Sequence, residues 1–233
     1  MSEYGYVSEN YERLVSEIRE YEARFGRRIT LVAVTKSGSD EELCALAKAG
    51  VTDIGENRPT ELKRRGELLR DKGYKPRLHE IGNLQRNKVK LVIDTVSLIH
   101  SVGKLELAEE ISKQAQKLGI TVPVLIEVNS AKEENKGGIF PEDAEALFLK
   151  VRELPGISVK GIMTMGPALD CAEAMRPYFR LTKKIFDRIN NIYGFDGDGI
   201  LSMGMSDSYA VAIEEGSTLI RVGRKLFDKN EGR

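Results

Sequence analysis

Short apolar segments alternate with helical patterns along this chain, and eight such segments follow one another at a near-constant step. The first, ITLVAVT at 29–35, is apolar throughout and rich in β-branched residues, as is typical of a strand buried on both faces. The other expected strands span 51–55, 77–81, 96–102, 122–128, 157–163, 199–203 and 217–222. Eight parallel strands that alternate with helices can close into a barrel. We therefore predict an α/β protein with a single (β/α)8 TIM barrel rather than an open doubly wound sheet.

The helical segments repeat their apolar residues with the period of an α-helix. An extra N-terminal helix ends near Gly26 and is expected to pack on the barrel. Other expected helices span 40–49, 59–72, 85–92, 104–118, 141–154 and 210–214, with a long helix after the sixth strand. The expected inward faces of two of them include Leu118 and Ile192. No composition shift divides the chain, so one domain is expected to fill residues 1–233, with residues 1–26 as the added helix.

The charges of the chain are balanced, with 36 Lys and Arg against 36 Asp and Glu among 233 residues. A net charge of zero lacks the broad cationic field that attracts nucleic acid or an anionic membrane, so neither is an expected partner. No apolar run reaches the ~18 residues of a membrane span, and the N-terminus does not resemble a signal peptide. Two histidines and the widely separated Cys44 and Cys171 offer neither a metal-ligand pattern nor a disulfide framework. We expect a cytoplasmic protein without a metal site.

Lys36 stands directly after the first expected strand. In a closed barrel of this kind, functional groups project from the C-terminal ends of the strands. A lysine amine at such a place is available for imine formation. Position alone does not distinguish an imine-forming lysine from a solvated one, so both interpretations stay open at this point.

The ends of the seventh and eighth expected strands carry SMGMS at 202–206 and RVGR at 221–224. Small residues let backbone N–H groups approach an anion closely, hydroxyls add further donors, and this architecture often binds phosphate at that place. Glycine in such loops can equally be plain turn chemistry. Two glycine-bearing loops at the two expected strand ends favour phosphate binding.

Other polar clusters follow the second, third and fifth expected strands: GENR at 55–58, HEIGNLQRNK at 79–88 and NSAKEENKGG at 129–138. For any one cluster, the ordinary polarity of loops is a sufficient explanation. His79 begins a segment dense in amides and bases, so it is a candidate for a contact to a ligand at the rim of the barrel.

Taken in order, these motifs resemble the pyridoxal phosphate homeostasis protein family, the small single-barrel relatives of the alanine racemase N-terminal domain. The HxIGxLQxNK and SMGMSD patterns are the most specific. The matching pieces are AVTK at 33–36, GEN at 55–57, HEIGNLQRNK at 79–88, IEVNSAKEENKGGI at 126–139, VKGIMTM at 159–165, LSMGMSDSYAVAIEEGST at 201–218 and IRVGRKLF at 220–227. The resemblance implies a fold-type III barrel that binds pyridoxal 5'-phosphate (PLP).

The resemblance also implies roles for individual residues. It places PLP on Lys36 as a Schiff base, Asn57 near the phenolic oxygen of the cofactor, and Arg221 at the pyridine nitrogen. A guanidinium cannot accept a proton, so the ring nitrogen would stay unprotonated and carbanion chemistry would be restrained. The residues implied around the phosphate are Ser202, Ser206, Gly223 and Arg224. Asn57 and Arg221 are expected at the mouth of the barrel rather than in its core.

One position departs from the family pattern. Members commonly follow the eighth-strand glycine with Thr or Ser, whereas Arg224 follows Gly223 in this chain. The backbone N–H of Arg224 can still serve a phosphate, while its side chain either supplies charge or points outward.

The leading hypothesis is a non-catalytic PLP carrier or regulator, expected as a monomer, that buffers the cofactor or delivers it to PLP-dependent client enzymes. Racemases add a C-terminal domain with a second acid/base residue, and this chain is expected to lack both that domain and that residue. A low-activity PLP-dependent amino-acid racemase, with Tyr209 or His79 as the second proton carrier, is the alternative. A cofactor-free Schiff-base barrel of the aldolase type is a third reading. Lys136 is either an accessory lysine for a second PLP or, as we favour, a solvated loop residue.

Overall fold

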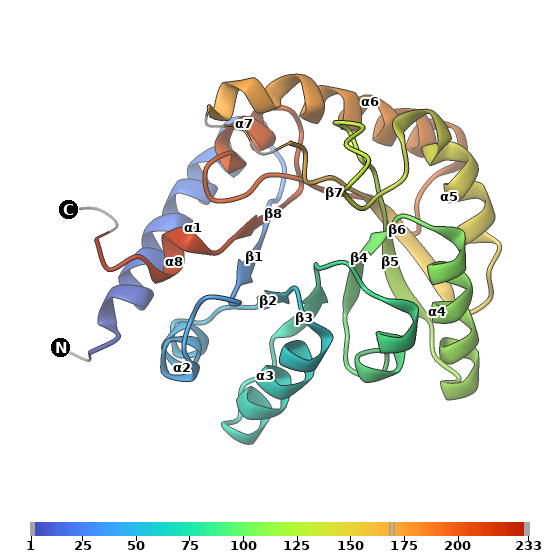
Figure 1. Ribbon diagram of the computed structural model, residues 1–233. Helices are drawn as coiled ribbons and strands as arrows, with labels where there is room; N and C mark the ends of the chain where they lie inside the picture. Colours follow the sequence, from blue (N-terminus) through green and yellow to red (C-terminus); the bar gives the residue numbers. More distant parts are fainter. Residues whose placement is uncertain (1–2, 168, 170, 231–233) are drawn as a thin grey trace.

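The computed structural model describes residues 3–167, 169 and 171–230. Eight parallel strands close into a barrel, in which each strand pairs with the next along the chain and the last pairs with the first (Figure 1). The strands are β1 (Thr30–Val34), β2 (Asp53–Glu56), β3 (Arg77–Glu80), β4 (Leu98–Val102), β5 (Val122–Glu127), β6 (Ile157–Met163), β7 (Ile200–Ser202) and β8 (Leu219–Val222). The predicted TIM barrel is confirmed.

Helices cover the outside of the barrel (Figure 1). The α-helices are α1 (Gly5–Phe25), α2 (Asp40–Lys48), α3 (Pro59–Asp71), α4 (Leu105–Leu118), α5 (Ala144–Arg152), α6 (Arg176–Tyr193), α7 (Tyr209–Glu214) and α8 (Arg224–Phe227). The short 3-10 helices are η1 (Arg86–Leu91), η2 (Pro141–Asp143) and η3 (Ala172–Met175). Within the described ranges, no helix combines the length and the apolar character needed to cross a bilayer.

The inside of the barrel holds a small apolar cluster that is separate from the larger core under the helices. Its members are Val32, Leu98, Leu125, Met163 and Leu219. Side chains alternate between the two faces of a strand, so residues two positions further along each strand also point inward. Polar residues occupy several of these inward positions, above the apolar cluster, and they line the C-terminal end of the barrel interior.

The N-terminal helix α1 packs against α2 and α8. Val7, Leu14 and Ile18 form its buried stripe, and Gly26 ends it in a left-handed conformation with φ of 63°. The Asn10 side-chain amide donates a hydrogen bond to the Asp228 carbonyl at 2.9 Å. This bond ties the first helix to the segment that follows the last strand.

Three helical expectations differ from the structure. The segment 85–92 forms the 3-10 helix η1 instead of an α-helix; Val89 is the buried residue of η1, so the segment lacks the apolar stripe that holds an α-helix on the barrel. Leu118 and Ile192, expected to face inward, are 51% and 59% exposed. Both lie in the last turn of their helices, just before Gly119 and Gly194. The apolar spacing of the sequence continues into these last turns, but the helix ends extend past the surface on which the helices pack.

Candidate functional site

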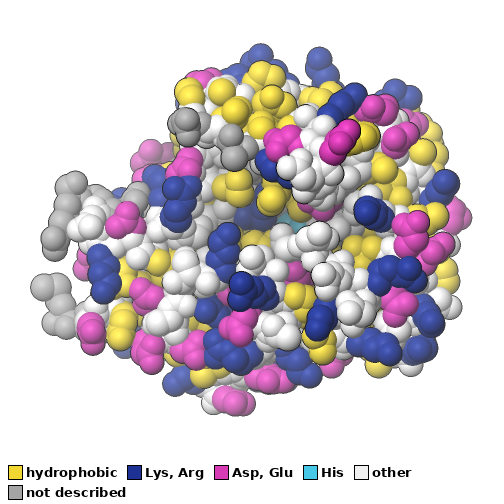
Figure 2. Space-filling view, in the orientation of Figure 1, with side chains coloured by type: hydrophobic (Ala, Val, Ile, Leu, Met, Phe, Trp, Pro, Cys, Tyr) yellow, Lys and Arg dark blue, Asp and Glu magenta, His cyan; other side chains and the backbone are white. Residues whose placement is uncertain are grey.

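A cavity of about 750 Å³ opens at the C-terminal ends of the strands. Figure 2 shows a hollow near the centre of this face, with hydrophobic side chains gathered around it. Met165, Leu169 and Met205 contribute to its lining and remain 41%, 44% and 39% exposed, so the rim is partly apolar. The cavity lies where the loops after the strands carry function in this class of barrel.

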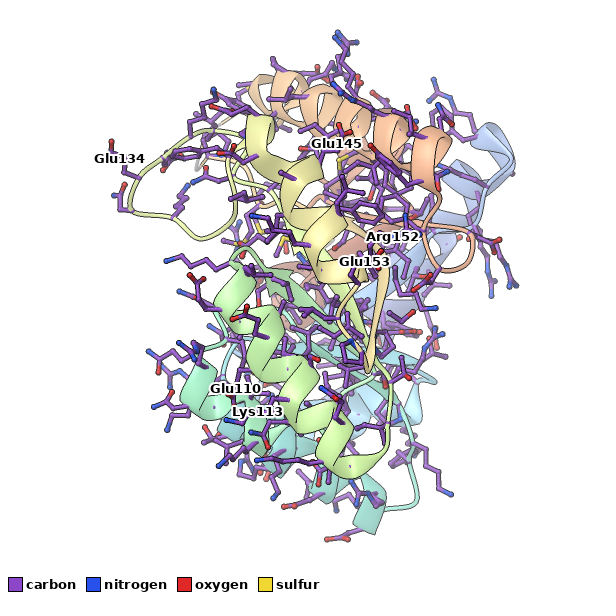
Figure 3. All side chains as sticks on the ribbon, turned by 90° about the vertical axis from the view of Figure 1, so that its right-hand side faces the viewer. Glu110, Lys113, Glu134, Glu145, Arg152 and Glu153 are labelled. Carbon is purple, nitrogen blue, oxygen red and sulfur yellow. The ribbon has the colours of Figure 1, made fainter. Side chains whose placement is uncertain are left out.

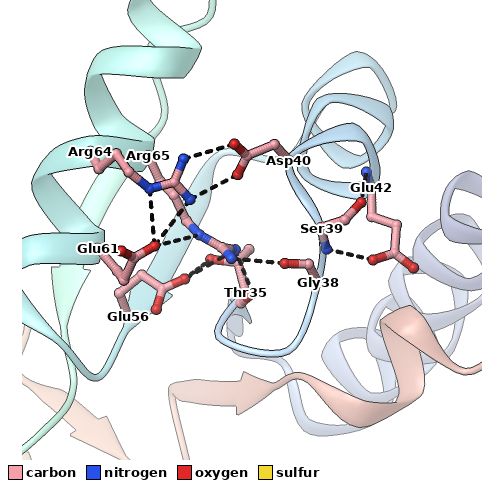
Figure 4. A network of polar contacts seen from close by, with 9 residues as sticks. All are labelled: Thr35, Gly38, Ser39, Asp40, Glu42, Glu56, Glu61, Arg64 and Arg65. Atoms are coloured by element: carbon pink, nitrogen blue, oxygen red, sulfur yellow. Dashed lines mark hydrogen bonds and ion pairs between the residues drawn. The ribbon is translucent and has the colours of Figure 1, made fainter.

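Lys36 lies on the turn after β1, is exposed, and lines the cavity. Behind this turn, Arg65 of α3 donates hydrogen bonds to the carbonyl groups of Thr35 at 2.5 Å and Gly38 at 2.7 Å (Figure 4). The Glu56 carboxylate accepts a bond from the Thr35 hydroxyl at 2.5 Å and lies 3.3 Å from Arg65. Thr35, Glu56 and Arg65 are buried, so this network fixes the turn from the outer side and leaves the Lys36 side chain in the cavity wall.

Arg221 of β8 is the buried cation of the cavity, with 3% of the residue exposed. Its guanidinium donates from Nη1 to the Ser202 hydroxyl at 2.5 Å and from Nη2 to the Thr164 carbonyl at 3.0 Å. Burial lowers the pKa of Arg221 to about 10, although the nearby Glu127 raises it. The guanidinium is therefore charged at neutral pH and acts only as a hydrogen-bond donor.

Five buried side chains form a continuous path inside the barrel, here called the interior polar network: Asp53, His79, His100, Ser202 and Arg221. His79 Nε2 lies 2.9 Å from Asp53 Oδ1, and His79 Nδ1 lies 2.9 Å from His100 Nε2. His100 Nδ1 in turn lies 3.1 Å from Ser202 Oγ. The path joins β2, β3 and β4 to β7 and β8.

The two ends of the interior polar network have fixed hydrogen-bond directions, because Arg221 can only donate and the Asp53 carboxylate can only accept. Ser202 Oγ therefore accepts from Arg221, and His79 Nε2 carries the proton that it donates to Asp53. Between these ends, one proton is shared by His79 Nδ1 and His100 Nε2, and one by His100 Nδ1 and Ser202 Oγ. Each contact of the path is thus a hydrogen bond with one donor.

Burial and neighbouring groups keep His100 uncharged and Asp53 ionised. Burial lowers the pKa of His100 well below its ordinary value, and His79 and Arg221 lower it further. Burial alone would raise the pKa of Asp53, but hydrogen bonds from His79, Arg77 and Thr52 outweigh that effect and hold the pKa at about 2. The network carries a positive charge at its cavity end and a negative charge at its other end.

The loops after β7 and β8 bring backbone close to the cavity. The Gly223 N–H lies 3.3 Å from the Ser206 hydroxyl, and a Cβ at Gly223 would lie 2.9 Å from the Val34 carbonyl oxygen. Gly204 has φ of 96°, and a Cβ there would lie 2.6 Å from the Ala212 Cβ. Only glycine fits both positions, so these loops form a small-residue cradle of the kind that offers donors to an anion.

The structure places most residues expected at the site in the wall of this one cavity: Lys36, Asn57, Ser206, Arg221, Gly223 and Arg224. Ser202 differs, because it is fully buried and its hydroxyl bonds Arg221 and His100 instead of standing beside Ser206. His79 is 4% exposed inside the barrel, so the expected rim position is wrong. Arg221 lines the cavity, yet its side chain is buried in the barrel and not only at its mouth.

Sequence reasoning missed Asp53, His100 and Glu127 as parts of this region. The signal was available in the alternation of strand side chains. Glu127 shares its face with Leu125, and His100 shares its face with Leu98, both of which lie in the inner cluster. A polar residue two positions after an inward apolar one, near the end of a barrel strand, points toward the mouth.

Comparison with known proteins defines the class first. The model of the alanine racemase N-terminal domain family matches residues 10–230, which is nearly the whole barrel. Together with the closed eight-stranded sheet and the lysine that follows β1, this match makes the chain an alanine racemase-like TIM barrel.

The relatives then define the particular family. The pyridoxal phosphate homeostasis protein of Aquifex aeolicus is 39% identical over 226 residues, which is 96% of this chain and 98% of that protein. That of Helicobacter pylori is 33% identical over 220 residues, 93% of this chain and 96% of that protein. The structure of PipY from Synechococcus elongatus with PLP bound is similar, with a TM-score of 0.83 and 26% identity over 95% of this chain and all of that one. The chain belongs to the pyridoxal phosphate homeostasis protein family.

Proposed function

We propose that this protein binds PLP in the cavity at the barrel mouth, as a Schiff base on Lys36, and buffers or delivers it inside the cell. The observation that carries this proposal is that Lys36, Arg221 and the backbone at Ser206 and Gly223 line one cavity. They offer an amine for the aldehyde, a donor for the ring nitrogen and backbone groups for the phosphate. The PLP bound by the related PipY supports PLP as the ligand.

The residues around the cavity fit storage better than turnover. PLP, when bound, supplies an aldehyde carbon and a ring that accepts electrons best when its nitrogen is protonated. Arg221 carries its charge at neutral pH and cannot accept a proton, so a ring nitrogen facing it is left unprotonated. The electron sink is weak as a consequence, and we propose a carrier without robust catalysis.

The racemase alternative needs a second proton carrier at the cavity, and neither candidate for that role lines it. The Tyr209 hydroxyl bonds the Glu17 carboxylate of α1, on the outer side of the barrel. His79 lies inside the barrel, with both ring nitrogens engaged by Asp53 and His100. We further propose a cytoplasmic monomer that serves PLP-dependent client enzymes.

Borohydride reduction of the protein after incubation with PLP tests the proposal. We expect a yellow protein whose imine absorption disappears on reduction, and peptide mass spectrometry should find the added mass on Lys36. The Lys36→Ala variant should take up no covalent label there. A colourless protein that takes up no PLP would instead favour the cofactor-free aldolase reading, and label confined to another lysine would overturn the assignment of Lys36.

Substitution of Arg224 tests which part of that residue matters. Its side chain pairs with Asp207, and the two side chains are 75% and 68% exposed, so the guanidinium is directed to the surface. Exposed pairs contribute at most about 1 kcal/mol, so we expect Arg224→Ala to lower the free energy of unfolding by less than that. PLP affinity, measured by absorption titration, should change by less than about threefold, which corresponds to well under 1 kcal/mol. A much larger loss of affinity would show that the guanidinium itself holds the phosphate.

A further inference from the structure

A second cavity, of about 800 Å³, adjoins the one that contains Lys36. It lies between the loops after β3, β4 and β5, and it includes much of the 79–88 motif that the proposed PLP site does not use. Figure 3 shows the loop after β5 extending from the barrel, with Glu134 labelled on it. The two cavities share Asn83, Glu127 and Gly137 in their walls, so a molecule in the second cavity reaches the boundary of the first.

Glu127, at the end of β5, is the charged group of this shared wall. It is 9% exposed, and no residue of the described ranges donates a hydrogen bond to its carboxylate. A Cβ at Gly137 would lie 3.2 Å and 3.4 Å from the two carboxylate oxygens, so the absence of a side chain at Gly137 keeps the carboxylate uncovered. Burial raises the pKa of Glu127 to about 7, although Arg221 lowers it.

A second polar group of the cavity also lacks a partner. Ser101 of β4 is 4% exposed, and its hydroxyl makes no hydrogen bond with any described residue. Buried polar groups are nearly always hydrogen-bonded, so an unpartnered hydroxyl in a cavity wall points to a polar occupant. The backbones of Gly103 and Gly138 meet beside it, where a Cβ on Gly103 would lie 2.6 Å from the Gly138 Cα, so the wall there is backbone without bulk.

We propose that this second cavity admits a primary amine as its ammonium ion, and that Glu127 accepts the proton which frees the amine for transfer of PLP from Lys36. The proposal rests on the proposed function. A buried carboxylate without a donor and a hydroxyl without a partner, both in the wall of this cavity, match the hydrogen-bonding needs of an ammonium group, which has three donors and no acceptor. Glu127 and Lys36 line the same cavity, so the proton acceptor and the lysine amine that leaves the cofactor face the same space.

The protons balance in this scheme. An N–H bond of the incoming ammonium breaks and an O–H bond forms on the Glu127 carboxylate, which leaves a lone pair on the amine nitrogen. The amine nitrogen takes over the C=N bond to the cofactor carbon as the C=N bond from the Lys36 nitrogen breaks, and the two protons left on the incoming nitrogen pass to the Lys36 nitrogen. Glu127 then returns its proton to the Lys36 amine, so Glu127 ends ionised and Lys36 ends as an ammonium.

Exchange kinetics of the PLP-loaded protein test the role of Glu127. Methylamine and glycine, each mixed with loaded protein at pH 7.5, should release Lys36 from the cofactor, followed as borohydride-fixed label lost from Lys36. General base catalysis contributes about 100-fold or more, so we expect Glu127→Gln to exchange about 100-fold more slowly. Glu153→Gln is the matched control, because Glu153 is an exposed carboxylate at the end of α5 that lines neither cavity and should exchange at the wild-type rate. Faster exchange with glycine than with methylamine would identify a free amino acid as the incoming amine. Equal rates would identify a lysine-type amine.

Binding to the cofactor-free protein provides a second measurement. Methylammonium should shift the NMR amide signals of Gly103, Gly137 and Gly138, and the shifts should be lost in Glu127→Gln. Exchange at the wild-type rate in Glu127→Gln would overturn the proposal, and so would methylammonium shifts that survive this substitution. In either case, label on Lys36 would leave the proposed PLP function intact. Absence of any label on Lys36 in the wild type would overturn both.

Discussion

Replacing Arg221 by glutamine is expected to lower the free energy of unfolding by about 2–4 kcal/mol, because two buried acceptors lose their donor. These acceptors are the Ser202 hydroxyl and the Thr164 carbonyl, at 2.5 Å and 3.0 Å from the guanidinium. Loss of the positive charge also raises the pKa of Glu127 further, since the charge of Arg221 is what opposes the effect of burial there. The cofactor absorption should shift as well, because the donor proposed to face the ring nitrogen is gone.

Urea unfolding and absorption spectra of Arg221→Gln measure these effects, with Arg224→Gln as the matched control. Arg224 is also a cavity-lining arginine, but it pairs with Asp207 at the surface, so the same substitution should cost less than about 1 kcal/mol. Equal stability of the two variants would contradict the place of Arg221 in the interior polar network. An unchanged cofactor spectrum in Arg221→Gln would contradict its place beside the ring.

The barrel itself could be predicted because its signal is repeated along the whole chain. The strand at 29–35 is recognisable by its β-branched apolar run, and the structure places β1 within it at Thr30–Val34. Residues that follow such strands directly, such as Lys36 and Asn57, could be placed at the cavity because strand ends alone determine that position. Their placement needs no knowledge of how one strand is aligned with its neighbour.

The interior polar network could not be predicted in this way, since it depends on contacts across the barrel. His79 and His100 meet because their neighbouring strands β3 and β4 are in a particular register, in which His79 pairs with Leu98. Ser202 comes from β7, on a different part of the barrel wall, and reaches His100 only through closure. The sequence places His79 at the start of a polar loop, and only the inward direction of its side chain shows that it belongs to the barrel interior.

The interior polar network makes this barrel sensitive to mild acid through His100. The imidazole is held neutral in the folded state because burial lowers its pKa, while an unfolded histidine binds a proton near pH 6.5. Below that pH the unfolded state binds more protons than the folded state, so the stability present above pH 6.5 is lost as the pH falls. The loss is about 1.4 kcal/mol per pH unit, or about 2 kcal/mol between pH 6.5 and 5.

We expect His100→Gln to remove this part of the pH dependence, since glutamine carries both a donor and an acceptor for its neighbours but does not titrate. Glu80 and Glu127 act in the opposite direction, because burial raises the pKa of each carboxyl to about 7 and the folded state then binds the extra proton. Both carboxyls are present in the wild type and the variant, so their effects cancel in the difference between the two. Urea unfolding at pH 8, 7, 6 and 5 gives that difference. It should shrink by about 2 kcal/mol from pH 8 to pH 5, and a constant difference would mean that His100 binds a proton as readily in the folded barrel as in the unfolded chain.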